Sequence, residues 1–249
     1  MESFDIIGYT SVAGPPPGQN FDVGALTTRI GRLLRRDDLD GEIVFWLNYA
    51  YQTLCDRVNF WELRTLVTYS LTATVWKYDL PADFMRVDRA YYKATASSNP
   101  VWGRNLWPLP REWYADAELE RRENTGSQAK GDLLHYLIDG NQVIFYPVPL
   151  YTGNTVEFTY YHLPVQLINS SDQPEIAPRY RHYLIWLAYF WGQVFLEKQD
   201  PNKIMLWERK FNQTINDVKR VVEKRENRAR QILAPITGTE GGDKIYGGG

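Results

Sequence analysis

Few side chains in this sequence have the types and spacing that catalysis or metal binding requires. The three histidines, His135, His162 and His182, stand apart from one another, with no cysteine or carboxylate at ligand spacing. The lone Cys55 has no partner for an internal disulfide, and its place on a predicted helix indicates a small buried apolar group. We therefore expect no metal site.

Two acidic groups match known site patterns only in part. Asp38 and Asp40 precede Gly41 as in a calcium loop, but Arg36 stands where that motif needs a carboxylate. Asp132 and Asp139 could form a catalytic pair, but Asp139 falls in a predicted hairpin turn. The nucleophile motif G-x-S-x-G, phosphate-binding glycine loops and the dinucleotide fingerprint are absent from the sequence. The sequence predicts neither an enzyme nor a cofactor.

One group of charges could bind a partner, and we call it the basic span. Its six cations stand against only Glu223 and Glu226, which leaves a surplus of four positive charges: Lys219, Arg220, Lys224, Arg225, Arg228 and Arg230. Cations suit the C-terminal end of a helix, so this could be a solvated helix end. Alternatively, the span meets phosphates or an acidic partner. The net charge of the whole chain, −2, does not by itself demand nucleic acid.

Two helices of opposite character are predicted near the C-terminus, and the second of them carries the basic span. Residues 178–198 are apolar around most of the helix, and such a helix has to be covered on every side. The next helix begins at Asp200-Pro201, an N-cap followed by a proline at the first helical position. Its apolar residues form one narrow stripe: Ile204, Trp207, Phe211, Ile215, Val218 and Val222.

The rest of the chain predicts an α+β fold. Helical periodicity at 25–36 and 41–58 precedes period-two strands near 67–75, 85–94, 134–138, 143–146 and 155–161. We expect a helical bundle from both chain ends (25–64 and 166–233) with an inserted antiparallel β module of hairpins or a small sandwich (65–165). Extended arms are expected at 1–24 and 234–249.

Exposed aromatic residues and the absence of membrane signals narrow the function. Residues 97–131 are predicted to be irregular, so Trp102, Trp107 and Trp113 have little local core and are expected to contact another chain. The longest apolar run, 183–191, is nine residues, whereas a membrane span needs about 20. No secretory signal is expected, because residues 1–5 have no basic or apolar region.

Three motifs and the closing helix pair resemble adaptor proteins of tailed bacteriophages, over most of residues 25–230. They are Trp61-Glu62-Leu63-Arg64, the run Tyr78-Asp79-Leu80-Pro81-Ala82-Asp83-Phe84-Met85-Arg86, and the hairpin at 136–149. The resemblance implies a ring, usually of twelve copies, that lies under the portal, continues the DNA channel and docks the tail. The implied partners are other copies of the chain, the portal protein, tail and nozzle proteins, and packaged double-stranded DNA bound without sequence preference. The implied location is the portal vertex of a virion assembled in the host cytoplasm, without a membrane.

The resemblance also suggests roles for particular residues. The C-terminal arm would bind the portal through Ile232, Leu233, Ile236, Ile245 and Tyr246, and the basic span would face the channel or the portal junction. The predicted helix 178–198 would lie at the subunit boundary through its aromatic residues Tyr183, Trp186, Tyr189, Phe190 and Trp191. The three tryptophans Trp102, Trp107 and Trp113 would face the tail. Two alternatives stay open: a carbohydrate- or host-surface-binding module that uses aromatics on a β scaffold, and a nucleic-acid-binding regulator that uses the basic span.

Overall fold

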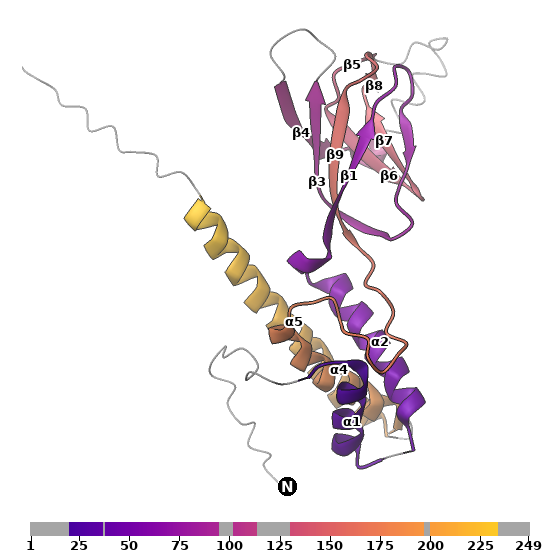
Figure 1. Ribbon diagram of the computed structural model, residues 1–249, viewed down its shortest axis with the longest axis vertical. Coiled ribbons are helices and arrows are strands. Elements are labelled where there is room, and N and C mark those ends of the chain that lie inside the picture. Colours follow the sequence, from indigo (N-terminus) through magenta and orange to yellow (C-terminus); the bar gives the residue numbers. More distant parts are fainter. Residues whose placement is uncertain (1–19, 37, 95–101, 114–129, 197–199, 234–249) are drawn as a thin grey trace, which may run out of the picture.

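The computed structural model describes residues 20–36, 38–94, 102–113, 130–196 and 200–233. It contains a helical part, formed by both ends of the described chain, and a β module formed by its middle (Figure 1). The expected α+β fold class is confirmed. Most of the two expected arms lies outside the described residues, and Val23 and Gly24 already belong to the first helix.

The helical part consists, in the described residues, of α1 (Val23–Leu34), α2 (Asp40–Arg57), α4 (Pro178–Leu196) and α5 (Pro201–Leu233). Helix α1 begins after Asp22, whose carboxylate accepts a hydrogen bond from the Ala25 N–H at 2.7 Å. As predicted, Asp200 caps α5, because its carboxylate accepts from the N–H groups of Asn202 at 3.1 Å and Lys203 at 3.3 Å.

The first apolar core lies between these helices. Seven of its fully buried leucines and isoleucines come from α1, α2 and α4: Leu26, Ile30, Ile43, Leu47, Leu54, Leu184 and Leu187. Each contributes about 1.5–3 kcal/mol relative to an exposed side chain. The predicted stripe of α5 is buried at Phe211, Ile215, Val218 and Val222, whereas Ile204 and Trp207 are only partly buried. Helix α5, about 50 Å long for its 33 residues, extends beyond the other helices, and its C-terminal end lies to one side of the β module (Figure 1).

The β module is one curled sheet with the strand order β1-β9-β3-β4-β6-β7-β2. Its strands are β1 (Arg64–Ser70), β2 (Lys77–Asp79), β3 (Phe84–Ala94), β4 (Trp102–Pro108), β6 (His135–Asp139), β7 (Gln142–Tyr146) and β9 (Thr155–His162). Tyr69 on β1 contacts Phe145 on β7 at a ring centroid distance of 5.9 Å, although these strands are far apart in the sheet order. The curl thus closes around a second apolar core.

Three details differ from the sequence-based expectation. The β4–β6 pair and the short pair β5 (Lys130–Gly131) with β8 (Val148–Pro149) are parallel, so the module is not wholly antiparallel. Part of the segment expected to be irregular forms β4, which pairs with β3. The expected strand 67–75 ends at Ser70, because the Val75 N–H donates to the Thr72 carbonyl at 3.1 Å and closes a turn.

The turn sequences Asp139-Gly140-Asn141 and Gly153-Asn154, each between two predicted strands, predict two hairpins, and the two predictions have different outcomes. Gly140 and Asn141 connect β6 to β7 as expected, and Gly140 adopts a φ of 60°, which glycine tolerates without strain. Gly153 and Asn154 do not join β7 to β9 as a hairpin. Instead, their backbones bond to Leu71, at 3.0 and 2.8 Å, and β9 pairs with β1 and β3.

Candidate interaction surfaces

The aromatic face of α4 is largely covered by the chain's own helices. Tyr189 and Phe190 each lie 5.9 Å from Trp207 of α5 between ring centroids, and Trp191 stacks on Tyr49 of α2 at 4.3 Å. Trp186 packs on its helical neighbour Phe190 at 6.1 Å. These side chains, and Tyr183, are partly buried. Only the part of each ring that remains exposed is therefore available for contact with a second chain.

The close packing of α4 against α2 depends on one small residue. A Cβ on Gly192 would lie 2.8 Å from two ring atoms of Trp46, and Trp46 is fully buried. The indole of Trp46 therefore fills the space that a side chain on α4 would occupy. This contact sets how closely α4 approaches α2.

Other apolar side chains of the helical part are much more exposed, and the sequence reasoning missed them. Phe45 on α2 is 65% exposed and Met205 on α5 is 68% exposed. Leu206, Phe195 and Leu196 are also exposed. The sequence held one signal for them, which is an apolar residue off the buried face of its helix. Phe45, for example, lies two positions from both Ile43 and Leu47, which are buried. Exposed apolar groups on a bundle are candidates for contact with another chain.

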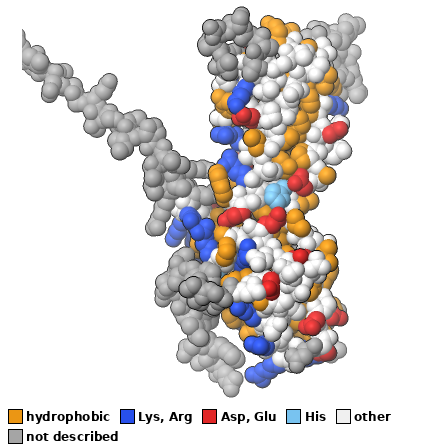
Figure 2. Space-filling view, viewed as in Figure 1, with side chains coloured by type: hydrophobic (Ala, Val, Ile, Leu, Met, Phe, Trp, Pro, Cys, Tyr) orange, Lys and Arg blue, Asp and Glu red, His pale blue; other side chains and the backbone are white. Residues whose placement is uncertain are grey.

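The basic span lies on the distal half of α5. The side chains of Lys219, Arg220, Lys224 and Arg225 are exposed. Arg220 lies 3.1 Å from Asp217 and Lys219 lies 4.0 Å from Glu223, so the first two cations have acidic neighbours on the same helix. Arg228 and Arg230 belong to α5, but their side chains are outside those described. On the face shown in Figure 2, most Lys and Arg side chains lie along the edge from which α5 projects.

The proposed portal-binding residues lie at or beyond the end of this helix. Ile232 and Leu233 form the last positions of α5, with side chains outside those described. Ile236, Ile245 and Tyr246 lie outside the described residues. The direction of α5 in Figure 1 carries this end of the chain away from the helical core.

The tryptophans expected on a tail-facing loop lie partly on a strand. Trp107 belongs to β4 and is 67% exposed, and Trp113 follows β4 in a helical turn and is 65% exposed. Trp102 begins β4 opposite Ala94, and its side chain is outside those described. Residues 95–101 and 114–129 lie outside the described residues. The backbone N–H of Trp107 donates to Leu134 at 3.0 Å, so a rigid strand presents this indole.

The junction between the two parts is held by Arg86 of β3. Its guanidinium donates hydrogen bonds to three carbonyls at the C-terminal end of α2: Cys55 at 3.0 Å, Val58 at 2.9 Å, and Asp56. The same guanidinium lies 5.1 Å from the ring centroid of Tyr161. A cation at this end of a helix also complements the helix dipole. Sequence reasoning missed this contact, because its partners are backbone atoms of a distant segment.

Asn48 ties the return segment 163–177 to α2. Its amide nitrogen donates to the Leu167 carbonyl at 2.7 Å, and its amide oxygen accepts from the Leu167 N–H at 2.8 Å. The Tyr51 hydroxyl accepts from the Glu175 N–H at 2.8 Å. Together with Arg86, these contacts fix the orientation of the β module relative to the helices.

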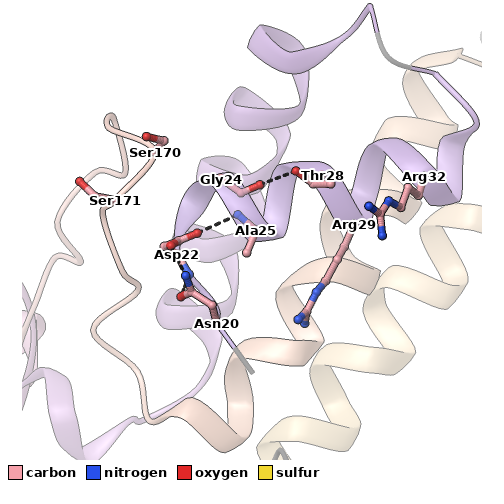
Figure 3. Close-up of a pocket in the computed structure, with 9 residues that line it drawn as sticks. All are labelled: Asn20, Asp22, Gly24, Ala25, Thr28, Arg29, Arg32, Ser170 and Ser171. Carbon is pink, nitrogen blue, oxygen red and sulfur yellow. Dashed lines mark hydrogen bonds between the residues drawn. The ribbon is translucent and has the colours of Figure 1, made fainter. Parts of the chain in front are cut away.

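A surface depression of about 530 Å³ lies at the start of α1 (Figure 3). Several of its polar groups already have partners: Asp22 caps the helix, the Thr28 hydroxyl donates to the Gly24 carbonyl at 2.8 Å, and the Gly24 N–H donates to the Ser170 carbonyl at 2.9 Å. Arg29 lies over the ring of Phe21 at 5.1 Å. These contacts stabilise the helix start and provide no reactive group.

The residues considered for metal or acid–base chemistry do not meet in a site. Asp38 pairs with Arg36 at 2.7 Å, which lowers the pKa of the Asp38 carboxyl. Asp132 accepts from the Tyr92 hydroxyl at 3.2 Å, whereas Asp139 lies 3.3 Å from Arg111. Burial raises the pKa of the Cys55 thiol well above its ordinary value, which disfavours a reactive thiolate. Among the described residues, no three His, Cys, Asp or Glu side chains are grouped to hold a metal ion.

The features described above are exposed apolar and charged side chains, which are surfaces available for contact with other macromolecules. Within the described part of the chain, no helix has the length and apolar character to cross a membrane. A search of curated proteins gives no match to the sequence. A family model described as SU10 adaptor protein matches residues 21–236, which include both the helical part and the β module. The chain thus belongs to the SU10 adaptor protein family, as a structural head–tail adaptor of a phage virion.

Proposed function

We propose that the protein forms a ring, of about twelve copies as adaptors of this type usually do, that joins the portal vertex to the tail and continues the DNA channel. Family membership supports a role among virion components such as portal and tail. The observation that carries the ring is the exposure of apolar side chains on the helical part, including Phe45 on α2 and Met205 on α5. A ring closes when each subunit offers two different complementary surfaces.

The two parts of the chain would then divide the work. Helical residues 25–64 and 166–233 form the ring, and the partly exposed rings of α4, from Tyr183 to Trp191, lie at or next to the subunit boundary. The inserted module, 65–165, points Trp107 and Trp113 toward tail or nozzle proteins. The rigid junction at Arg86 supports this division, because it holds the module at a fixed angle to the helices.

The distal half of α5 would reach the portal. Its basic span then faces the channel or the portal junction, where loose electrostatic contact lets DNA pass without sequence recognition. In this proposal the C-terminal arm, 234–249, follows the end of α5 in the sequence and binds the portal through its apolar residues. Helix α5 supports this assignment because it extends beyond the helical core (Figure 1).

Substitutions in the helical part test the ring. Trp186→Asp or Trp191→Asp should leave capsids without tails, because a buried unpaired charge costs several kcal/mol. Met205→Asp is the sharper variant, since Met205 is exposed and its loss should leave the single chain folded. We expect a native circular dichroism spectrum but loss of the oligomer in light scattering. Val75→Asp, on an exposed turn of the β module, is the matched control. An unchanged oligomer with Met205→Asp would contradict the ring surface.

Truncation after Leu233 tests the portal contact. The shortened chain keeps every buried residue of the two cores, so it should fold and still form the ring. We expect it to be lost from portal-containing capsids in sedimentation. Unchanged affinity for the portal would remove the C-terminal arm from the proposal.

Point substitution is the appropriate test of the tail-facing tryptophans. Deletion of 97–131 would remove β4 and break the sheet between β3 and β6. Trp107→Ala with Trp113→Ala should instead spare the ring and impair tail attachment. The exposed indoles also fit a second candidate function, the stacking of sugars from a carbohydrate or host surface. Binding of the wild-type protein, but not of the double variant, to a glycan panel would favour that alternative.

A further inference from the structure

Strand β1 has an open edge. It is the first strand in the sheet order and pairs with β9 on one side, and no other strand among the described residues pairs with its second side. Near the C-terminal end of β1, the Tyr69 hydroxyl donates to the carbonyl of Asp79 on β2 at 3.1 Å, so β2 lies close to this part of β1. In its N-terminal half, Leu66 is 56% exposed. Natural proteins usually cover or block such an edge, because its free N–H and C=O groups accept a further strand.

The sequence before the described residues contains a segment suited to that edge. Residues 4–12 read Phe-Asp-Ile-Ile-Gly-Tyr-Thr-Ser-Val, in which six of the nine residues are aromatic or β-branched and only Asp5 is charged. The nine residues are enough to pair with the seven residues of β1. The C-terminal arm is a poorer candidate, because six of the residues 234–249 are glycine.

The spacer between this segment and the fold favours a neighbouring molecule. Residues 13–19 include three consecutive prolines, and proline-rich spacers extend by about 3.1 Å per residue and resist folding back. The spacer joins Asn20, beside the start of α1 in the helical part, not the β module. This spacer composition and its point of attachment therefore favour pairing of residues 4–12 with a neighbouring copy.

We propose that residues 4–12 of one copy add as a strand to the open edge of β1 of a neighbouring copy. The added backbone pairs with N–H and C=O groups on the open side of β1 in its N-terminal half, and its apolar side chains cover Leu66. The occupant is thus a second copy of this chain, and the contact links ring subunits through strand exchange. This inference rests on the proposed ring, since it requires a neighbour.

Cross-linking between full-length chains tests the pairing. One variant carries Tyr9→Cys and another carries Leu66→Cys, and the two are mixed and treated with a short flexible bismaleimide. The native Cys55 is buried and gives little background. We expect a covalent dimer of the two variants, at a yield about tenfold above that with Ile168→Cys, because paired strands hold facing side chains within about 5 Å. Ile168 is also exposed, but it lies on the return segment 163–177, away from the β1 edge.

A proline pair separates strand pairing from simple proximity. Ile7→Pro removes a backbone donor from the middle of the segment, and it should reduce the yield from Tyr9→Cys at least about tenfold. Ala13→Pro is the matched control, since it adds a proline within the spacer 13–19 and outside residues 4–12, and it should leave the yield unchanged. Equal yields from the two proline variants would overturn the proposal. So would cross-linking confined to single chains that carry both cysteines. An intact oligomer without the product would refute strand exchange alone, whereas a monomeric mass would also refute the ring.

Discussion

The contact of Arg86 with the end of α2 leads to a quantitative prediction. Arg86→Ala removes a charged donor from three carbonyls, of which the bonds to Cys55 and Val58 are partly buried. A hydrogen bond from a charged group contributes about 1.5–3 kcal/mol, so the loss of the two partly buried bonds should cost about 3–6 kcal/mol. That is a large fraction of the ~5–15 kcal/mol typical of a folded protein. Arg86→Lys keeps the charge but not the forked geometry, and should lose less.

Urea unfolding, followed by fluorescence and by circular dichroism, measures this loss. Arg89→Ala is the matched control, since Arg89 is exposed on the same strand. The two apolar cores are joined at this junction, so Arg86→Ala should also separate their unfolding into two transitions. A loss within about 1 kcal/mol of the Arg89→Ala value, with a single transition, would refute the reasoning.

Three further substitutions probe the packing and the titrating groups. Gly192→Ala should destabilise by about 1–3 kcal/mol in urea, because its Cβ would overlap the Trp46 ring, whereas Gly41→Ala, with open space around it, should not. Burial raises the pKa of Tyr92 to about 12, so its contribution to stability is present below pH 10 and is lost as the pH rises toward 12. Tyr92→Phe should flatten that alkaline loss in urea midpoints. Burial lowers the pKa of His182, so stability should fall as the pH drops below 6.5, and His182→Gln should remove that dependence.

The helices and their caps could be predicted because their signals are local. The stripe from Phe211 to Val222 and the cap at Asp200 each depend on residues within a few turns of one another. Strand β4 could not be found in this way. Its sequence, Trp102-Gly103-Arg104-Asn105, has no alternation, and it becomes a strand by pairing with β3. Tertiary pairing there overrides local preference.

The candidate surfaces could be predicted only in part, because side-chain exposure depends on tertiary packing. The aromatic composition of α4 indicated that it needs covering, but composition could not show that Trp207 and Tyr49 of the same chain supply much of the cover. The exposure of Met205 depends on how α5 rotates against α4, which is a property of the packed pair. The family resemblance was readable from motifs that span both parts, and the match over 21–236 confirms it.

The insertion of the β module between α2 and α4 has a consequence for synthesis. Roughly 120 residues separate the end of α2 from the start of α4. At about 5–20 residues per second, a ribosome needs roughly 6–24 s to make them. During that time Leu47 and Leu54 have been synthesised, but Leu184 and Leu187, which share their core in the folded protein, have not. The apolar face of α2 in the nascent chain therefore stays without its α4 partner for far longer than a helix takes to form, a period in which exposed apolar surface favours aggregation.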